Sequence, residues 1–131
     1  MMLSLTFKEV QKRLTVFDKK RGWDKSSSPE LHFNRLISEV GELSDAIFKI
    51  WIETSENCSS SVSFKEAREK AISITKDEVA EEISDCIIYL VKIGNSLNID
   101  VGEAIAQKMK KNEERDWGKF DKKIQAAPSE L

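Results

Sequence analysis

Apolar residues along the chain recur with the spacing of amphipathic α-helices, and no segment shows the strong alternation of a β-strand. On a helical wheel of the stretch FNRLISEVGELSDAIFKI, an arc of about 80° holds a set of apolar side chains, namely Leu36, Val40, Leu43, Ile47 and Ile50. This arc is predicted to face a core. The pattern therefore predicts an all-α fold.

Polar residues mark where the predicted helices begin. Three segments have the pattern of capping boxes: TFKE at residues 6–9, SFKE at residues 63–66 and TKDE at residues 75–78. A further helix start is predicted at Ser28, as the N-cap residue, with Pro29 at the first helical position. We expect helices near residues 7–21, 29–51, 64–73, 76–97 and 101–117. They would form one helical bundle with a four-helix core in a single domain, residues 1–120, followed by a frayed tail, residues 121–131.

Two carboxylates interrupt the apolar arc. Glu39 lies at its edge, and Glu42 lies just outside it on the same side, three residues on. An unpaired carboxylate removed from water costs several kcal/mol or becomes protonated. The position therefore calls for a basic partner, a metal ion or an exposed cleft.

A second helix carries the same pattern. When EVGELSDAIFKI is aligned with EISDCIIYLVKI, Glu39 matches Glu82 and Glu42 matches Asp85. Two such helices packed antiparallel would bring four carboxylates together, and these repel unless cations lie between them. Ligands that are all oxygen favour Mg²⁺, or Mn²⁺. A di-iron bundle needs Glu-x-x-His on two helices, and the only histidine, His32, does not provide it.

The last long helix carries a complementary set of donors. Lys108, Asn112 and Arg115 are spaced i, i+4 and i+7 and share one face, which suits phosphate binding. A solvated basic face is the alternative, because Lys110, Lys111 and Lys119 are also nearby. Together with the carboxylates, these residues favour a site for Mg²⁺ and a polyphosphate.

Composition narrows the function classes. The formal net charge of −2 gives no electrostatic signature for binding a nucleic acid polymer. Cys58 and Cys86 form no CxxC pair, which suits a reducing, cytoplasmic setting. No stretch approaches the roughly 20 apolar residues needed to span a membrane. The chain also lacks a P-loop, so an ATPase of that type is excluded.

EVGEL, followed by EEISDCIIYLVKIGNSLNIDVGEAIAQKMKKNEERDW, resembles the MazG-like nucleotide pyrophosphohydrolases of the all-α NTP pyrophosphatase superfamily. The resemblance spans roughly residues 20–117 and lies near the MazG and dCTP pyrophosphatase branches. It implies a MazG-like fold and Mg²⁺-dependent hydrolysis of a (d)NTP to the monophosphate and pyrophosphate, as nucleotide-pool house-cleaning.

The resemblance also assigns roles. It implies that Glu39, Glu42, Glu82 and Asp85 bind metal, with Glu39 or Glu42 as general base. The K-M-x-x-N-x-x-R segment resembles the phosphate-binding helix of the family. Likeness to dCTP pyrophosphatases implies a preference for deoxynucleotides, and relatives imply a homodimer or homotetramer. A non-catalytic helical interaction or metal-sensing module is the alternative function.

Two features depart from the family pattern. The segment from about residue 51 to residue 76 lengthens the gap between the carboxylate pairs, and we expect it to form a longer loop and a short helix. Relatives often read His-x-Pro before the first motif, whereas this chain has Ser27-Ser28-Pro29. Trp23 could stack on a base or be a structural side chain beside the second helix. The sequence leaves the choice of base open.

Overall fold

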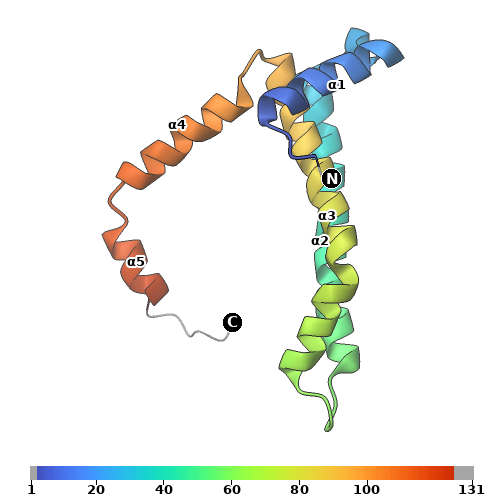
Figure 1. The fold of residues 1–131 in the computed structure, drawn as a ribbon, viewed down its shortest axis with the longest axis vertical. Coiled ribbons are helices and arrows are strands. Elements are labelled where there is room, and N and C mark those ends of the chain that lie inside the picture. The colour runs from blue at the N-terminus through green and yellow to red at the C-terminus, as the bar shows by residue number, and fades with distance from the viewer. Residues whose placement is uncertain (1–2, 126–131) are drawn as a thin grey trace. The chain divides into compact units, whose positions relative to one another are not determined.

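The computed structural model describes residues 3–125, and its regular elements are helical throughout (Figure 1). In chain order they are α1 (Phe7–Arg21), the 3₁₀ turn η1 (Trp23–Ser26), α2 (Pro29–Asn57), α3 (Phe64–Ser96), α4 (Val101–Glu114) and α5 (Gly118–Gln125). Residues 3–125 contain no strand, which confirms the predicted all-α class. The chain divides into two compact units, Met1–Val101 and Gly102–Leu131.

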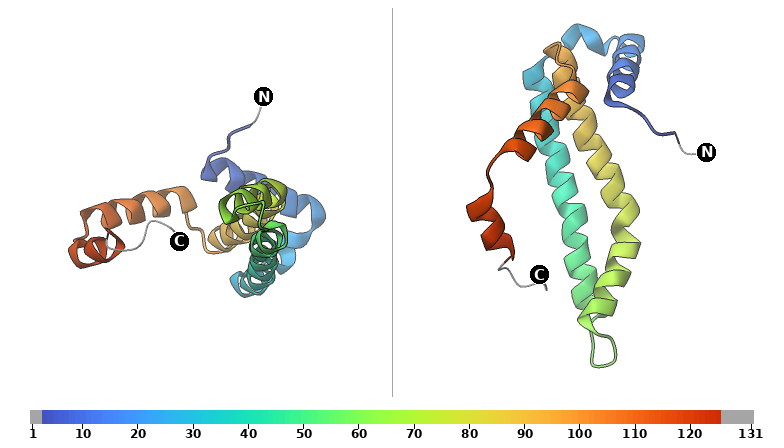
Figure 2. Two further views of the ribbon diagram at one scale, coloured as in Figure 1. Left: turned by 90° about the horizontal axis from the view of Figure 1, so that it is seen from below. Right: turned by 60° about the vertical axis from the view of Figure 1, so that its left-hand side comes forward.

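The first unit is built on an antiparallel hairpin of α2 and α3, against which α1 packs (Figures 1 and 2). The side chains between the helices are mostly small, which allows the two backbones to approach closely. The buried apolar set comprises Leu36, Ala46, Ala67, Ala71, Cys86 and Val91. Few large side chains are therefore fully enclosed within this unit.

Three of the predicted helix starts form as expected. The Thr6 hydroxyl accepts from the amide of Glu9 at 3.2 Å, and the Glu9 carboxylate accepts from the amide of Thr6 at 2.7 Å. Ser63 and Glu66 make the same pair of bonds. Ser28 caps α2 by accepting from the amide of Leu31.

The predicted start at residue 75 is wrong, because α3 runs unbroken through it. Thr75 is buried, and its hydroxyl donates to the carbonyl of Ala71 at 2.9 Å, so it serves the preceding turn instead of opening a new helix. Thr54 does the same in α2, donating to the carbonyl of Ile50 at 2.6 Å. The segment from residue 51 to residue 76 therefore lengthens both helices of the hairpin, and the connecting loop is confined to residues 58–63.

Only part of the predicted core-facing arc of α2 is covered within the first unit. Leu36 is buried, whereas Val40 and Ile47 are 46% and 49% exposed. Their counterparts in the internal repeat, Ile83 and Leu90, are also exposed. The arc is wider than the surface that α3 covers, so one edge of it faces away from the hairpin contact.

The second unit contains α4 and α5. Helix α4 ends at Glu114, earlier than predicted, because the indole of Trp117 folds back and donates to the carbonyl of Asn112 at 2.7 Å. Residues 121–125 lie in α5 and not in a frayed tail. The amides of Phe120 and Asp121 each donate to the carbonyl of Trp117 at 2.8 Å, which starts that helix. The rest of the predicted tail, residues 126–131, lies outside the described residues.

Across residues 3–125, no helix combines the length and the apolar character that a membrane crossing requires.

A buried ion pair ties α1 to α3. Lys92 Nζ lies 2.9 Å from Asp18 Oδ1, and the two side chains are only 10% and 13% exposed. Removing one partner leaves an uncompensated buried charge. Asp18→Ala should therefore lower the free energy of unfolding by about 3 kcal/mol in urea titrations. Lys49→Ala, which breaks the exposed pair with Glu78, should cost less than about 1 kcal/mol. Equal losses would contradict this ranking.

Candidate active site

The hairpin brings three of the four predicted carboxylates together. Glu39 and Glu42 come from α2 and Glu82 comes from α3, and one oxygen of each lies within 4.8 Å of the other two. Glu39 and Glu82 are partly buried, while Glu42 is exposed. The antiparallel packing of α2 on α3 thus converts the internal repeat into a single acidic cluster.

Asp85 lies at the edge of this cluster. Its side chain is exposed, and it lines the same pocket as Glu39. Its charge helps to raise the pKa of both Glu39 and Glu82. The fourth predicted carboxylate is therefore close enough to interact with the other three without belonging to the tight trio.

Burial and mutual repulsion make the charged state of the cluster costly. Burial raises the pKa of Glu39, and its hydrogen bond to Glu42 and the negative charges around it raise that pKa further. The pKa of Glu82 is raised in the same direction, first by burial and then by Glu42 and Asp85. One oxygen of Glu82, Oε2, is buried without a hydrogen-bond partner. The protein around the cluster therefore does not compensate the negative charge of these carboxylates.

No basic side chain pairs with the cluster among residues 3–125: the ion pairs there join Lys49 to Glu78, Lys92 to Asp18 and Lys110 to Glu114. The pKa of Arg35 is raised chiefly by its hydrogen bond with Tyr89, and the charges of Glu39 and Glu42 contribute less. Of the three compensations that the sequence allowed, a basic partner is therefore the least supported.

A hard divalent cation fits this donor set. The three ligand atoms that come together are carboxylate oxygens, and Glu82 also has an oxygen that is buried and unpartnered. The one nearby sulfur belongs to Cys86, whose pKa is raised by burial and by the surrounding carboxylates, so it stays a neutral thiol. The chemistry of the site therefore suits Mg²⁺ or Mn²⁺ better than a thiolate-seeking metal.

A pocket of about 370 Å³ opens beside the carboxylates, within the size range of small-molecule sites. It combines carboxylates with aromatic rings and cations, and its lining is Arg13, Leu14, Phe17, Trp23, Glu39, Asp85, Ile88, Tyr89 and Lys92. Trp23 is half exposed and also lines an adjoining pocket of about 380 Å³. The predicted substrate-binding tryptophan thus shares a cavity with two of the predicted metal ligands.

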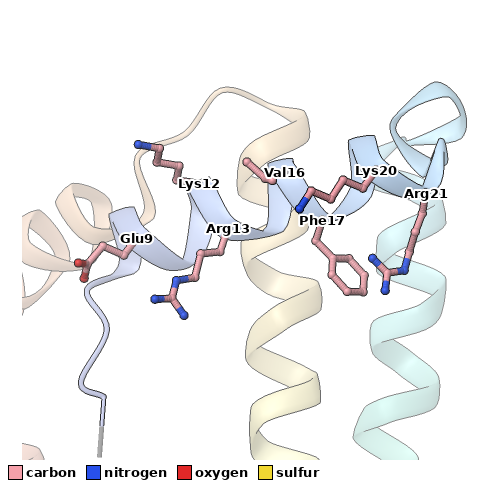
Figure 3. A pocket seen from close by; sticks show the side chains of 7 residues that line it. All are labelled: Glu9, Lys12, Arg13, Val16, Phe17, Lys20 and Arg21. Carbon is pink, nitrogen blue, oxygen red and sulfur yellow. The ribbon is translucent and has the colours of Figure 1, made fainter.

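The sequence did not predict the three further polar residues of this pocket, Arg13, Tyr89 and Lys92. Lys92 did appear in the internal repeat, matched to Lys49, but nothing there pointed to a pocket. Arg13 and Phe17 come from α1, and their approach to the carboxylates is set by how α1 packs on α3. The side of α1 that carries them is strongly cationic, and the arginines and lysines at residues 12, 13, 20 and 21 line a further groove (Figure 3).

His32 is not a member of the carboxylate trio, and its side chain is buried near the start of α2. Its Nε2 is 2.7 Å from the hydroxyl of Ser27, and burial followed by the charge of Lys92 lowers the pKa of its imidazole. Ser27 occupies the place where relatives often carry the first residue of His-x-Pro. In this chain an imidazole reaches that place from the first turn of α2 instead.

The predicted phosphate-binding residues belong to the second unit. Lys108 and Asn112 are exposed on α4. Arg115 follows the end of α4 and places its guanidinium over the ring of Trp117, 4.7 Å from the ring centroid. The predicted shared helical face therefore holds for the first two residues and not for Arg115.

Residues 27–120 match the family model of the MazG nucleotide pyrophosphohydrolase domain. The chain therefore belongs to this family, and its class is that of the nucleotide pyrophosphohydrolases. It is also similar to dCTP pyrophosphatase 1 of Mus musculus and of Rattus norvegicus, 27% identical to each over 110 residues. Those residues are 84% of this chain and 58% of each relative, so the chain spans little more than half of their length.

The raised pKa of Glu39 predicts how the stability of the metal-free chain depends on pH. The folded state holds this proton more tightly than the unfolded state, so raising the pH from the ordinary carboxyl value through the raised value destabilises the fold. Glu39→Gln removes that effect. In thermal unfolding with EDTA, the variant should match the wild type at low pH and become the more stable of the two as pH rises.

Mg²⁺ provides the second half of this test. It should raise the melting temperature of the wild type near neutral pH and have a smaller effect on Glu39→Gln, because binding to the folded state alone stabilises it. Glu81→Gln is the control, since Glu81 is exposed and outside the trio. If Mg²⁺ raises the melting temperature of Glu39→Gln as much as that of the wild type, Glu39 has no role in binding the metal.

Proposed function

We propose that the chain is a Mg²⁺-dependent nucleoside triphosphate pyrophosphohydrolase, with Mn²⁺ able to substitute, that converts a (d)NTP and water to the (d)NMP and pyrophosphate. The observation that carries this proposal is the trio of carboxylates from α2 and α3 with one buried, unpartnered oxygen. Membership of the MazG family supports the reaction class. Nucleotide-pool house-cleaning in the cytoplasm is the expected role.

In this proposal Glu39, Glu42, Glu82 and Asp85 hold the metal. A bound divalent cation neutralises phosphate charge and lowers the pKa of a coordinated water. Glu39 or Glu42 takes the proton from the attacking water, as both stand on the same side of α2. The oxygen of the attacking water forms a new bond to the α-phosphorus, and the bond from the α-phosphorus to the oxygen that bridges it to the β-phosphorus breaks. Pyrophosphate leaves with the electron pair.

The pocket beside the carboxylates is the proposed nucleoside site. Trp23 is exposed enough to stack on a base and shares its cavity with Tyr89, and aromatic faces of this kind accept any base. The ring of Trp23 also packs edge-on against Phe17, with ring centroids 5.8 Å apart, and this contact helps to fix the position of the indole. A preference for deoxynucleotides is proposed from the likeness to dCTP pyrophosphatase 1.

Lys108, Asn112 and Arg115 are proposed to bind the triphosphate. Their donors match phosphate oxygens, a point charge from Lys108, an amide from Asn112 and a forked guanidinium from Arg115. We also propose that the chain acts as a homo-oligomer, as the family resemblance implies.

The rival function is a helical module that binds metal or a partner protein without turnover. The carboxylate trio alone is compatible with it, because metal sensing needs the same ligands. The pocket favours the enzyme, since a cavity that joins aromatic rings, cations and two of the proposed metal ligands has no role in metal sensing alone.

Product analysis separates the two functions. With Mg²⁺ and each NTP and dNTP in turn, the wild type should release pyrophosphate and a nucleoside monophosphate. Glu39→Gln and Glu42→Gln should each lower the rate by about 10²- to 10⁴-fold if the residue is the general base. Orthophosphate and a nucleoside diphosphate as products would contradict the reaction class, and no turnover with any nucleotide would favour the rival module.

The phosphate-binding residues need their own comparison. Lys108→Ala and Arg115→Ala should each raise KM for the triphosphate, by roughly tenfold or more, because each removes a charged hydrogen bond. Lys110→Ala is the matched control, since Lys110 is exposed on α4 and its partner is Glu114. Steady-state kinetics measure all three, and equal effects would point to diffuse attraction by positive charge.

A further inference from the structure

The pocket beside the carboxylates has charges of both signs in its lining, and these charges do not pair with each other. Glu39 and Asp85 provide the negative charges, and Arg13 and Lys92 provide the positive ones. Lys92 is bound to Asp18 at 2.9 Å, so its charge is already compensated. Arg13 is therefore the cation of this lining whose charge is available to a ligand.

Arg13 is not engaged elsewhere on the first unit. Its side chain is exposed, and the ion pairs of residues 3–125 do not include it. An acid, Glu9, lies one turn before it, but the Glu9 carboxylate accepts from the amide and the hydroxyl of Thr6 at 2.7 and 2.8 Å. Arg13 makes only the smallest contribution to the lowered pKa of Glu9. Glu9 thus caps α1, and the guanidinium keeps its donors for another partner.

The side chain of Arg13 shares one side of α1 with an aromatic ring. In Figure 3, Arg13 and Phe17 extend to one side of the helix, and Lys12 extends to the other. Phe17 is four residues on, about 6 Å along the helix axis, and packs edge-on against Trp23. Along α1 the pocket lining therefore changes from a cation to aromatic rings.

A phosphate chain is the ligand that suits this lining. A guanidinium binds phosphate through two parallel N–H donors, and the carboxylates across the pocket call for a cation. A neutral ligand would leave both charges uncompensated, and a metal ion alone would leave Arg13 without a partner. A chain of phosphates that shares a divalent cation with the carboxylates compensates both.

We propose that Arg13 binds the phosphate chain of the substrate, at the end of the pocket away from the aromatic rings. The proposal rests on the proposed function for the identity of the substrate, whereas the contact itself needs only a phosphate chain. Arg13 and the carboxylates belong to the same compact unit. The first unit then has a phosphate-binding residue of its own, in addition to the residues proposed on and after α4.

Inorganic tripolyphosphate tests the contact without a nucleoside. Its affinity is measured by calorimetry with saturating Mg²⁺, because the carboxylates repel an anion unless a cation lies between them. Arg13→Ala should weaken binding by roughly tenfold or more, because it removes a charged hydrogen bond. Arg13→Lys should fall between Arg13→Ala and the wild type, because lysine keeps the charge and loses the forked donors.

Lys12→Ala is the matched control. It removes the same charge from α1, but Lys12 lines only the outer groove and not the pocket with the carboxylates. This variant should change the affinity by less than about threefold, as expected for an exposed charge. Equal losses in Lys12→Ala and Arg13→Ala, or wild-type affinity in Arg13→Ala, overturn the proposal. A wild type that does not bind tripolyphosphate overturns it as well.

Mg²⁺ alone separates a contact with phosphate from a structural role of Arg13. The rise in melting temperature that Mg²⁺ produces should be at least as large in Arg13→Ala as in the wild type, because the carboxylates are intact. If the variant loses this response together with tripolyphosphate binding, Arg13 supports the whole site and the proposal is wrong.

The product analysis with nucleotides keeps the proposed function separate from this proposal. If the wild type releases pyrophosphate while Arg13→Ala keeps the wild-type KM and tripolyphosphate affinity, the contact is wrong and the proposed function stands. If tripolyphosphate binding depends on Arg13 but the wild type turns over no nucleotide, the proposed function is wrong and the contact stands.

Discussion

The close antiparallel packing of α2 on α3 is the interaction on which the candidate site depends. Alanine and threonine at the contact let the helices approach, and Thr54 and Thr75 satisfy their hydroxyls within their own helices. That packing sets Glu82 opposite Glu39 and Glu42. The same contact that stabilises the hairpin therefore concentrates negative charge in it, and stability and site formation are opposed at these positions.

The acidic cluster could be predicted from sequence because the carboxylates recur in a repeat and because helices of this kind pack antiparallel. The same reasoning wrongly predicted a break between two helices near residue 75, where α3 is continuous. TKDE and SFKE have the same pattern of residue types, yet Ser63 is exposed and caps a helix, whereas Thr75 is buried and cannot turn to a new amide. Burial by α2 decides between them, and burial is a tertiary property.

The pocket illustrates a second limit of the sequence. Trp23 could be named because it lies beside the motif region, but Arg13 lines the pocket with Glu39 and Asp85 only because α1 packs on α3. The sequence is limited in the same way for the apolar arc on α2. Periodicity shows that Val40 and Ile47 need cover, but it cannot say whether α3 or another chain provides it. Their exposure in the folded first unit shows that α3 does not cover them.

The metal-free first unit is left with two unfavourable features, a cluster of carboxylates and a set of apolar side chains on α2 and α3 that it does not cover. The fold itself offsets neither of them, because few large side chains are enclosed within this unit. Under the proposed function, a cation that binds only the folded hairpin would add to the free energy of unfolding as its concentration rises. It would thereby offset the cost of bringing Glu39 and Glu82 together in the charged state.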